Sequence, residues 1–349
     1  MRFCGRRCAT LLALAMAPFM ASAGSARELV YVQASKSEEV VVIDANTFEP
    51  VTRIPIGGYT DDVVGLPDGT MAFTNVMLSN NSPLGSTVGE GGLVHGIDTA
   101  TNKLVWETFV DGLPNHMAVN SNGRELYVTL ADRSWIVVLD TRTGRILKRL
   151  FSVMGNHGAK MTPDGKHLVV GNMFIDAMLV YDAASGDVVR TINTREGVRP
   201  FQFDKRGKVY YQLSRFHGFE VRDLATGALE KVVELPKLPA SVPAPEAYPH
   251  TVDHGLAITP DGSAIVAAAS TGNYVAVYSL PDLKLRGTVP VGEDPNWIAV
   301  RADSKVAFVS NRKSNSISVV DLDGLKEIRK VPAGTLPQRL SVIDVPESM

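Results

Sequence analysis

Three of the seven histidines could act together, because each begins a short run of residues that ends in the same kind of tight turn. The three are His116 in "NHMAVNSNG", His157 in "HGAKMTPDG" and His254 in "HGLAITPDG". Asp62 stands at the corresponding point of another such run and adds a carboxylate. Neutral imidazole binds zinc, copper or iron, and a metal with an open position can activate water. The sequence therefore predicts a divalent metal ion, copper or zinc, held by His116, His157, His254 and Asp62.

Other side chains at the same point of the remaining runs suggest acid–base chemistry on a charged ligand. We expect His254, or His250 shortly before it, to move a proton, and Arg199 to orient a negative charge. A ligand or cofactor would be bound by Arg339, Trp297 and Asn296. Two alternatives stay open: the histidines line a wet channel and bond to backbone carbonyls, and Trp297 plugs that channel rather than stacking on a ligand.

The runs belong to an internal repeat. Six turns of the type "TPDGK" are centred on Gly69, Gly123, Gly165, Gly207, Gly262 and Ser304, and the numbers of successive centres differ by 54, 42, 42, 55 and 42. A period of about 42 residues is the length of one four-stranded propeller blade. Because side chains far apart in the chain then meet at one end of the ring, the repeat is what would bring the histidines together.

Each period contains four short strands and no helical pattern. In one period the strands are "HMAV", "ELYVTL", "WIVVLD" and "RILKRL", and the third of them recurs seven times in the chain. "GTLPQRLSVIDV" aligns with "GEDPNWIAVRAD" at a shift of one period, so the C-terminal strand should be the innermost strand of the blade formed by residues 29–54. The prediction is an all-β, seven-bladed propeller of four-stranded antiparallel blades, closed by pairing of the two ends.

The aspartates that end the third strands recur with the repeat. They are Asp44, Asp98, Asp140, Asp182, Asp223 and Asp321. Such recurrence is typical of residues that stabilise turns, so we expect no catalytic role for them.

The repeat units resemble the YVTN-repeat family of exported seven-bladed β-propellers. The resemblance rests on "RELYVTLADRSWIVVLDTRTGRILKRL", on "KVAFVSNRKSNSISVVDLDG" and on the blade endings "IPIGG", "VPVGE" and "VPAGT". It implies the fold over nearly the whole chain after the leader. It leaves the function open, because the family includes redox-enzyme subunits and lyase-like or lactonase-like relatives.

Two of the spacings between turns are longer than the other three, which indicates two insertions in the repeat. They cover residues 77–92 and 235–250, and the second contains His250. Both connect strands on the side of the ring where the innermost strands begin. We therefore expect both insertions on the face that carries the histidines.

Residues 1–26 have the pattern of an export signal: three arginines, an apolar run and small residues at its end. This predicts a periplasmic or secreted protein, with residues 27–349 as one propeller domain. Both cysteines lie in the leader, so no thiol chemistry is expected after its removal. Loss of the three arginines changes the formal net charge from −2 to −5, and no basic run remains, which argues against a nucleic-acid partner. No later segment is apolar enough to span a membrane.

Three functions remain open from the sequence. The first is a binding or accessory protein that holds a metal or small ligand, or docks a periplasmic redox partner, at the channel mouth. The second is a metal-dependent lyase or hydrolase that acts on a small anionic or lactone-like substrate. The third, a copper redox role, has the least support, because the histidines are few.

Overall fold

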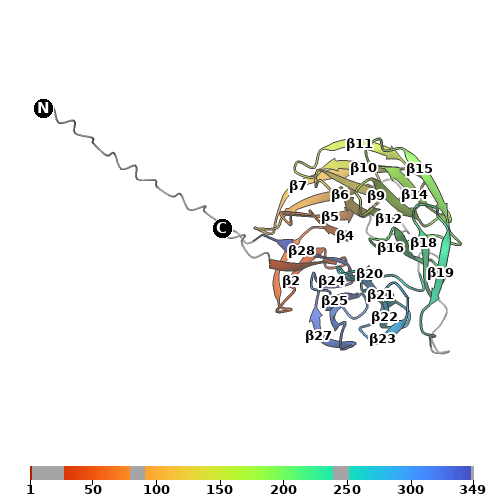
Figure 1. The fold of residues 1–349 in the computed structure, drawn as a ribbon. Helices are drawn as coiled ribbons and strands as arrows, with labels where there is room; N and C mark the ends of the chain where they lie inside the picture. The colour runs from red at the N-terminus through yellow and green to blue at the C-terminus, as the bar shows by residue number, and fades with distance from the viewer. Residues whose placement is uncertain (2–26, 79–90, 239–250, 347–349) are drawn as a thin grey trace.

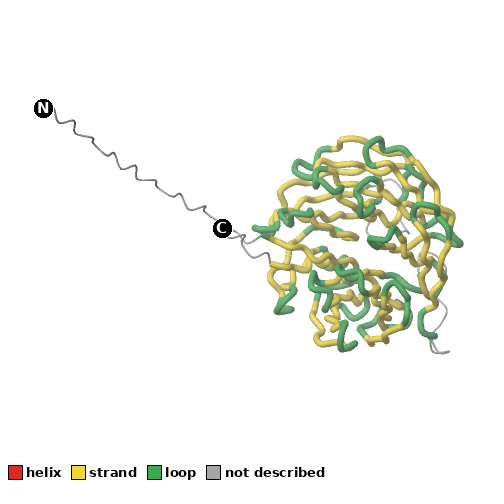
Figure 2. Tube along the Cα trace, viewed as in Figure 1, coloured by secondary structure: helices red, strands yellow, loops and turns green. Residues whose placement is uncertain are grey.

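The computed structural model describes residues 1, 27–78, 91–238 and 251–346. The predicted export signal and His250 lie outside these residues, and so does most of both insertions. In the described part the chain forms 28 strands, and Figure 2 shows strands and loops arranged around a ring. None of the described segments is a helix of the length and apolarity that a membrane span needs.

The strands form seven sheets of four, and these are the blades in Figure 1. The first three blades contain the following strands, innermost first. Blade 1 contains β28 (Pro337–Val345), β1 (Arg27–Ala34), β2 (Glu39–Asp44) and β3 (Pro50–Pro55). Blade 2 contains β4 (Tyr59–Gly65), β5 (Met71–Met77), β6 (Gly92–Asp98) and β7 (Lys103–Val110). Blade 3 contains β8 (Pro114–Val119), β9 (Glu125–Leu130), β10 (Trp135–Asp140) and β11 (Ile146–Phe151).

The other four blades repeat this order. Blade 4 contains β12 (Asn156–Met161), β13 (His167–Asn172), β14 (Ala177–Asp182) and β15 (Val188–Asn193). Blade 5 contains β16 (Val198–Phe203), β17 (Lys208–Leu213), β18 (Gly218–Asp223) and β19 (Leu229–Glu234). Blade 6 contains β20 (Leu256–Ile258), β21 (Ala264–Ala269), β22 (Tyr274–Ser279) and β23 (Leu285–Pro290). Blade 7 contains β24 (Pro295–Val300), β25 (Val306–Asn311), β26 (Ser316–Asp321) and β27 (Lys326–Pro332).

The ring is closed as the sequence predicts. Strand β28 pairs antiparallel with β1, with Val342 opposite Val30 and Val345 opposite Arg27. Closure pairs the inner edge of β1, which would otherwise offer a template for aggregation. The predicted fold class is confirmed.

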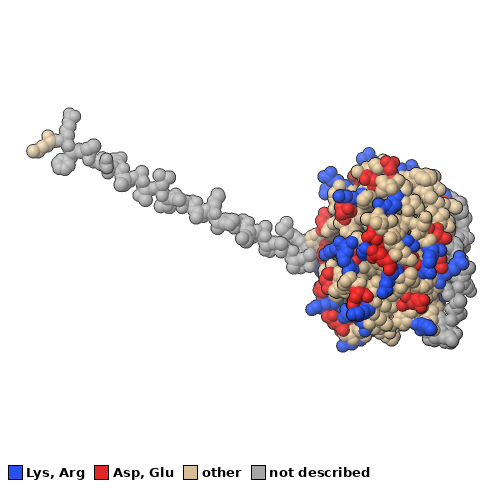
Figure 3. Space-filling model, turned by 45° about the vertical axis from the view of Figure 1, so that its right-hand side comes forward, with Lys and Arg blue, Asp and Glu red and all other residues tan. Residues whose placement is uncertain are grey.

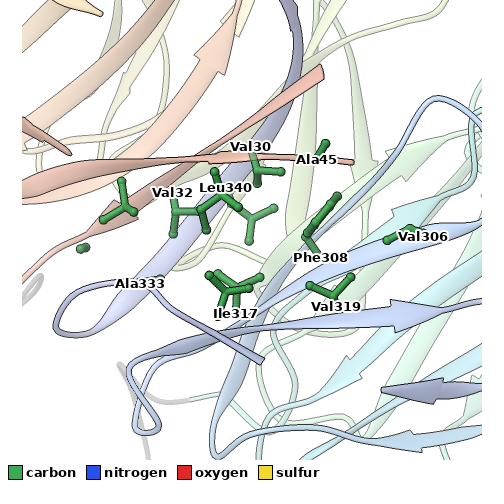
Figure 4. Packing of buried hydrophobic residues seen from close by; sticks show 13 residues of the cluster. Val30, Val32, Ala45, Val306, Phe308, Ile317, Val319, Ala333 and Leu340 are labelled. Carbon is green, nitrogen blue, oxygen red and sulfur yellow. The ribbon is translucent and has the colours of Figure 1, made fainter. Parts of the chain in front are cut away.

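The core lies between neighbouring blades, because their two faces pack against each other. Between blades 1 and 7, Val30, Val32 and Leu340 pack with Phe308 and Ile317 (Figure 4). Burial of apolar surface contributes about 25 cal/mol per Å². Equivalent clusters between the other blades hold the innermost strands in a fixed arrangement around the axis of the ring.

Many charged side chains lie on the outer surface. Figure 3 shows lysine and arginine interspersed with aspartate and glutamate over one face of the molecule, without a continuous patch of either sign there.

Candidate functional site

The innermost strands begin irregularly, and this irregularity points side chains toward the centre. The pairing register shifts within the first residues of β4, β8, β12, β16 and β24. A β-bulge of this kind changes the direction of the following side chains. In all seven blades, the candidate residues lie at or just before these strand beginnings.

Three histidine rings from three blades touch at the centre. The ring centroids of His116 and His157 are 4.5 Å apart, and those of His157 and His254 are 5.4 Å apart. Each of the three residues is buried, with 6% or less of its surface exposed. The convergence of histidines from β8, β12 and the segment before β20 is therefore real, although the first and the last of them belong to blades that are far apart in the chain.

Arg339 and Trp297 complete the contact around these rings. The Nε of Arg339 donates to the Nε2 of His116 at 3.2 Å, and its Nη1 bonds to the carboxylate and to the carbonyl oxygen of Asp61. The guanidinium lies 5.4 Å from the centroid of the Trp297 ring. That ring lies 5.2 Å from His116 and 5.7 Å from His254, so Trp297 is packed among site residues and is partly exposed.

The bond from Arg339 determines the tautomer of His116. Because a guanidinium only donates, Nε2 of His116 must carry the lone pair, and the ring proton lies on Nδ1. Nδ1 is 3.4 Å from the Oδ2 of Asp62, which also accepts from the amide of Met117 at 2.8 Å. Burial raises the pKa of Asp62 to about 6, even though the charge of Arg339 acts in the opposite direction.

His157 and His254 are also neutral, but they differ from His116 in which ring nitrogen makes a hydrogen bond. Nδ1 of His254 is 3.1 Å from the carbonyl oxygen of Asn296, so Nδ1 donates and Nε2 keeps its lone pair. Within the described part of the chain, Nδ1 of His157 has no hydrogen-bond partner. Burial lowers the pKa of all three histidines well below the ordinary value, and nearby arginines lower it further.

Two more cations lie close enough to act on these pKa values. Arg199 is buried, and its guanidinium donates to the Oγ of Ser214 and to the Sδ of Met173, both at 3.1 Å. Lys160, farther along β12, interacts electrostatically with Asp62, and burial lowers its pKa. The site thus combines Arg339, Arg199 and Lys160 with two carboxylates and three neutral imidazoles, an arrangement that favours an anion.

The structure brings together most of the residues that the sequence singles out. His116, His157, His254, Asp62, Arg339 and Trp297 form one connected cluster. Arg199 is electrostatically linked to it, and Asn296 joins through its backbone carbonyl. Pro114 opposite Leu130 corresponds to Asn156 opposite Asn172, so Asn115 is the equivalent of His157 and His116 lies one residue further, as the period of 42 residues predicts. His250 lies outside the described residues.

The geometry gives the predicted metal ion little support. Among the described residues, no group of three or more His, Cys, Asp or Glu side chains is arranged to hold a metal ion. The lone pair of His116 already accepts from Arg339, and Nδ1 of His254 faces a carbonyl oxygen. Nearby guanidinium groups would also repel a divalent cation. The donors present therefore do not fit a metal site in this arrangement.

Sequence reasoning missed a set of polar side chains that fix the strand beginnings. They lie at the third position of the triplets "YVQ", "FTN", "YVT" and "FVS" in the second strands, and are Gln33, Asn75, Thr129 and Ser310. Ser310 shows the pattern, because it accepts from the amide of Trp297 and bonds to the carbonyl of Gln338 in the next blade. Recurrence of a polar residue at this point of the repeat was the available signal.

The sequence of this chain is similar to a known protein family over about half of its length. Residues 152–333 match a protein-family model described as "Lactonase, 7-bladed beta-propeller". No curated protein matches the sequence significantly.

Several solved structures share the fold at low identity. A putative 6-phosphogluconolactonase of Bacteroides fragilis is 16% identical, with a TM-score of 0.73 over 94% of this chain and 100% of that one. The periplasmic gluconolactonase of Pseudomonas aeruginosa is 17% identical, with a TM-score of 0.71 over 92% and 99%. Hydrazine synthase of Kuenenia stuttgartiensis is 18% identical, with a TM-score of 0.69 over 83% and 91%. At these identities the likeness extends to the fold alone.

Proposed function

Because the chain belongs to the lactonase family of seven-bladed β-propellers, we propose that its central cluster hydrolyses a small lactone that carries a negative charge. The observation that carries this proposal is a chain of three neutral imidazoles in contact, the first of which, His116, is bonded to a buried guanidinium from a fourth blade. Ester hydrolysis needs a base for water and a positive group for the oxyanion, and both are present.

The charge around the cluster supports an anionic substrate. Arg339 pairs with Asp61, and buried Arg199 lies close enough to His157 and His254 to lower their pKa. Guanidinium groups bind carboxylate and phosphate through paired hydrogen bonds. A phosphate or carboxylate on the substrate would therefore be oriented by Arg199, as the sequence suggests.

His254 is the best-placed base. Its Nδ1 is committed to the carbonyl of Asn296, so Nε2 can accept the proton of an attacking water. The oxygen of that water bonds to the lactone carbonyl carbon, and the resulting oxyanion is stabilised by Arg339. The carbon–oxygen bond of the ring then breaks, and the proton on His254 passes to the leaving ring oxygen, which gives a hydroxy acid.

Trp297 supplies the flat surface beside this base. Its ring packs against His254 and His116 and is partly exposed, so we propose that its exposed part contacts a sugar-like ring. We assign it to substrate binding rather than to proton transfer.

A panel of lactones tests the proposal. Proton release is followed with the purified protein on aldonolactones of one ring size, with and without a phosphate or carboxylate. We expect hydrolysis above the spontaneous rate, with kcat/KM about 10-fold or more higher for the charged lactones, since one guanidinium–anion contact is worth about 1.5 kcal/mol or more. If no lactone reacts above the spontaneous rate, the central cluster is a binding site instead, as the sequence-based alternative of an accessory protein holds.

The place of action follows from the leader. We propose a periplasmic or secreted enzyme, supported by the export-signal pattern of residues 1–26. Cell fractionation with an antibody against the chain tests this directly.

A further inference from the structure

Blade 6 begins differently from the other six blades. Its innermost strand β20 contains three residues, whereas the other innermost strands contain six or more. His254 lies in the irregular segment before β20. Strand pairing therefore does not fix this residue, and other contacts must do so.

Blade 5 provides several of those contacts. The amide of Val252 donates to the carbonyl of Ser214 at 3.3 Å, and the amide of Gly255 donates to the Oε1 of Gln212 at 2.8 Å. Asp253 lies between Val252 and Gly255 in the chain. Its carboxylate is fully buried and accepts from the amide of Gly218 at 2.9 Å.

His217, also in blade 5, contacts the carboxylate of Asp253. Its Nδ1 is 3.0 Å from the Oδ2 of Asp253, and its Nε2 is 2.9 Å from the carbonyl oxygen of Pro236. Both partners are acceptors, so both ring nitrogens must donate, and the ring is an imidazolium. The hydroxyl of Tyr274 also donates to the carbonyl of Pro236, at 2.6 Å.

The surrounding charges agree with an ion pair. Burial alone lowers the pKa of His217, but the hydrogen bond to Asp253 and the charge of that carboxylate raise it above its ordinary value. Glu234 on β19 acts in the same direction. On β22, burial and the charge of Asp253 raise the pKa of Tyr274 and Tyr278, which therefore stay neutral.

We propose that the His217–Asp253 ion pair positions His254 for the reaction. Asp253 is the residue directly before His254, and its carboxylate is held by blade 5 while the His254 ring reaches the centre and donates to Asn296 of blade 7. His217 is thus a positioning residue outside the central cluster. This inference rests on the proposed function for its effect on the reaction, but its effect on His254 can be measured separately.

The first measurement uses the unaltered protein. Imidazole nitrogen resonances at pH 7 should show His217 protonated on both nitrogens, and His254 protonated on Nδ1 only. A neutral His217 ring at this pH would overturn the proposal, because one of its two hydrogen bonds could not then exist.

The second measurement compares His217→Asn with His95→Asn. His95 is a matched control: it is fully buried, and its Nε2 lies 2.8 Å from the Oε2 of Glu107, remote from His254 in sequence and blade. We expect the His254 resonances to move in His217→Asn and to stay unchanged in His95→Asn. Unchanged resonances in both variants would refute the positioning role.

The third measurement is kinetic. His217→Asn should lower kcat about 10-fold with little change in KM, since a misplaced group costs up to about 10²-fold. Its pH profile should also lose the fall in activity that His217 deprotonation causes on the alkaline side. Unchanged kcat and pH profile would contradict the proposal. If the unaltered protein hydrolyses no lactone, the proposed function fails, and the His254 resonances alone decide whether the ion pair positions that residue.

Discussion

The turns of the ring and its centre use polar residues in opposite ways. At the turns, the same aspartate recurs and its carboxylate is satisfied by nearby amides: Oδ1 of Asp140 accepts from the amides of Arg142 and Thr143 at 3.1 and 2.9 Å. Asp44, Asp98, Asp182, Asp223 and Asp321 accept from backbone amides in the same way. The predicted turn-stabilising role is confirmed.

At the centre, equivalent positions hold different residues, and several of their polar atoms lack partners. Within the described residues these atoms are Oδ2 of Asp61, Oδ1 of Asn115, Nδ1 of His157 and Oδ1 of Asn296. Buried polar atoms are usually hydrogen-bonded, so a group of orphaned ones indicates a place for a ligand. The positions that repeat are satisfied and maintain the fold, whereas the positions that diverge at the centre are the ones on which the proposed function depends.

The largest expected effect is at Arg339. Arg339→Met removes the partner of buried Asp61 and the donor to His116. We expect a loss of about 3–5 kcal/mol in the free energy of unfolding, because an uncompensated charge stays buried. Lactone hydrolysis should fall at least about 10²-fold. Denaturant titration and proton release measure the two effects.

Arg149→Met is the matched control, since Arg149 pairs with Asp111 at 3.4 Å and both side chains are nearly half exposed. It should cost less than about 1 kcal/mol. Similar losses in the two arginine variants would remove the distinction between centre and surface.

His254→Gln should separate catalysis from stability. Loss of the base lowers kcat about 10²–10⁴-fold, while an amide of similar size keeps the fold. His167→Gln, at the beginning of β13 and outside the site, should keep full kcat. Equal activity of His254→Gln and the unaltered protein would rule out His254 as the base.

Acid should destabilise the protein through its central histidines. Their pKa values in the folded state lie well below 6.5, so below pH 6.5 the unfolded chain binds up to three protons that the folded chain does not. Below about pH 6, Asp62 binds one proton in the folded state and offsets one of the three. Stability should thus fall with decreasing pH by up to about 3 kcal/mol per unit for two protons. Thermal unfolding from pH 7 to pH 5 measures this.

His157→Gln should reduce that slope by about one proton. A slope that His157→Gln leaves unchanged would show that His157 titrates normally and is not buried as a neutral ring.

Asp140→Ala tests one repeated turn. It removes hydrogen bonds to two backbone amides at a mostly solvated site, so it should cost about 1 kcal/mol. Hydrolysis should be unaffected. A large loss of activity would show that the turns and the centre are coupled.

The smallest expected effect is that of metal removal. Because Arg339 and a backbone carbonyl engage the histidine nitrogens, dialysis against a chelator should leave hydrolysis and thermal stability unchanged. Elemental analysis of protein purified without an affinity tag checks this. A stoichiometric metal whose removal abolishes activity would restore the metal site predicted from the sequence.

The repeat made the fold and the meeting of the histidines predictable. A regular period places equivalent strands at equivalent angles, so His116, His157 and His254 had to converge, and Val342 had to pair near Val30. What the sequence could not supply is hydrogen-bond direction. The tautomer of His116 depends on Arg339, which belongs to a strand from the other end of the chain.

Contacts made by irregular segments could not be predicted from the sequence either. The pairing of His217 with Asp253 involves the segment before the short strand β20, which departs from the repeat, so the repeat could not predict this contact. The offset of His116 is present in the sequence, because His116 and His157 are 41 residues apart, one fewer than the repeat of 42. The β-bulges occur alike in both blades, and no residue pattern predicted them.

Because β28 pairs with β1, the first blade can be completed only after the C-terminal strand has been synthesised. A chain synthesised from its N-terminus carries β1 with an empty edge until residues 337–345 have emerged, and only then does Arg339 reach Asp61. Six blades can stack beforehand, with Arg199 and Lys160 already present, but Arg339 joins the centre in the final step. Truncation before residue 337 would thus abolish catalysis and leave an open edge that recruits other chains.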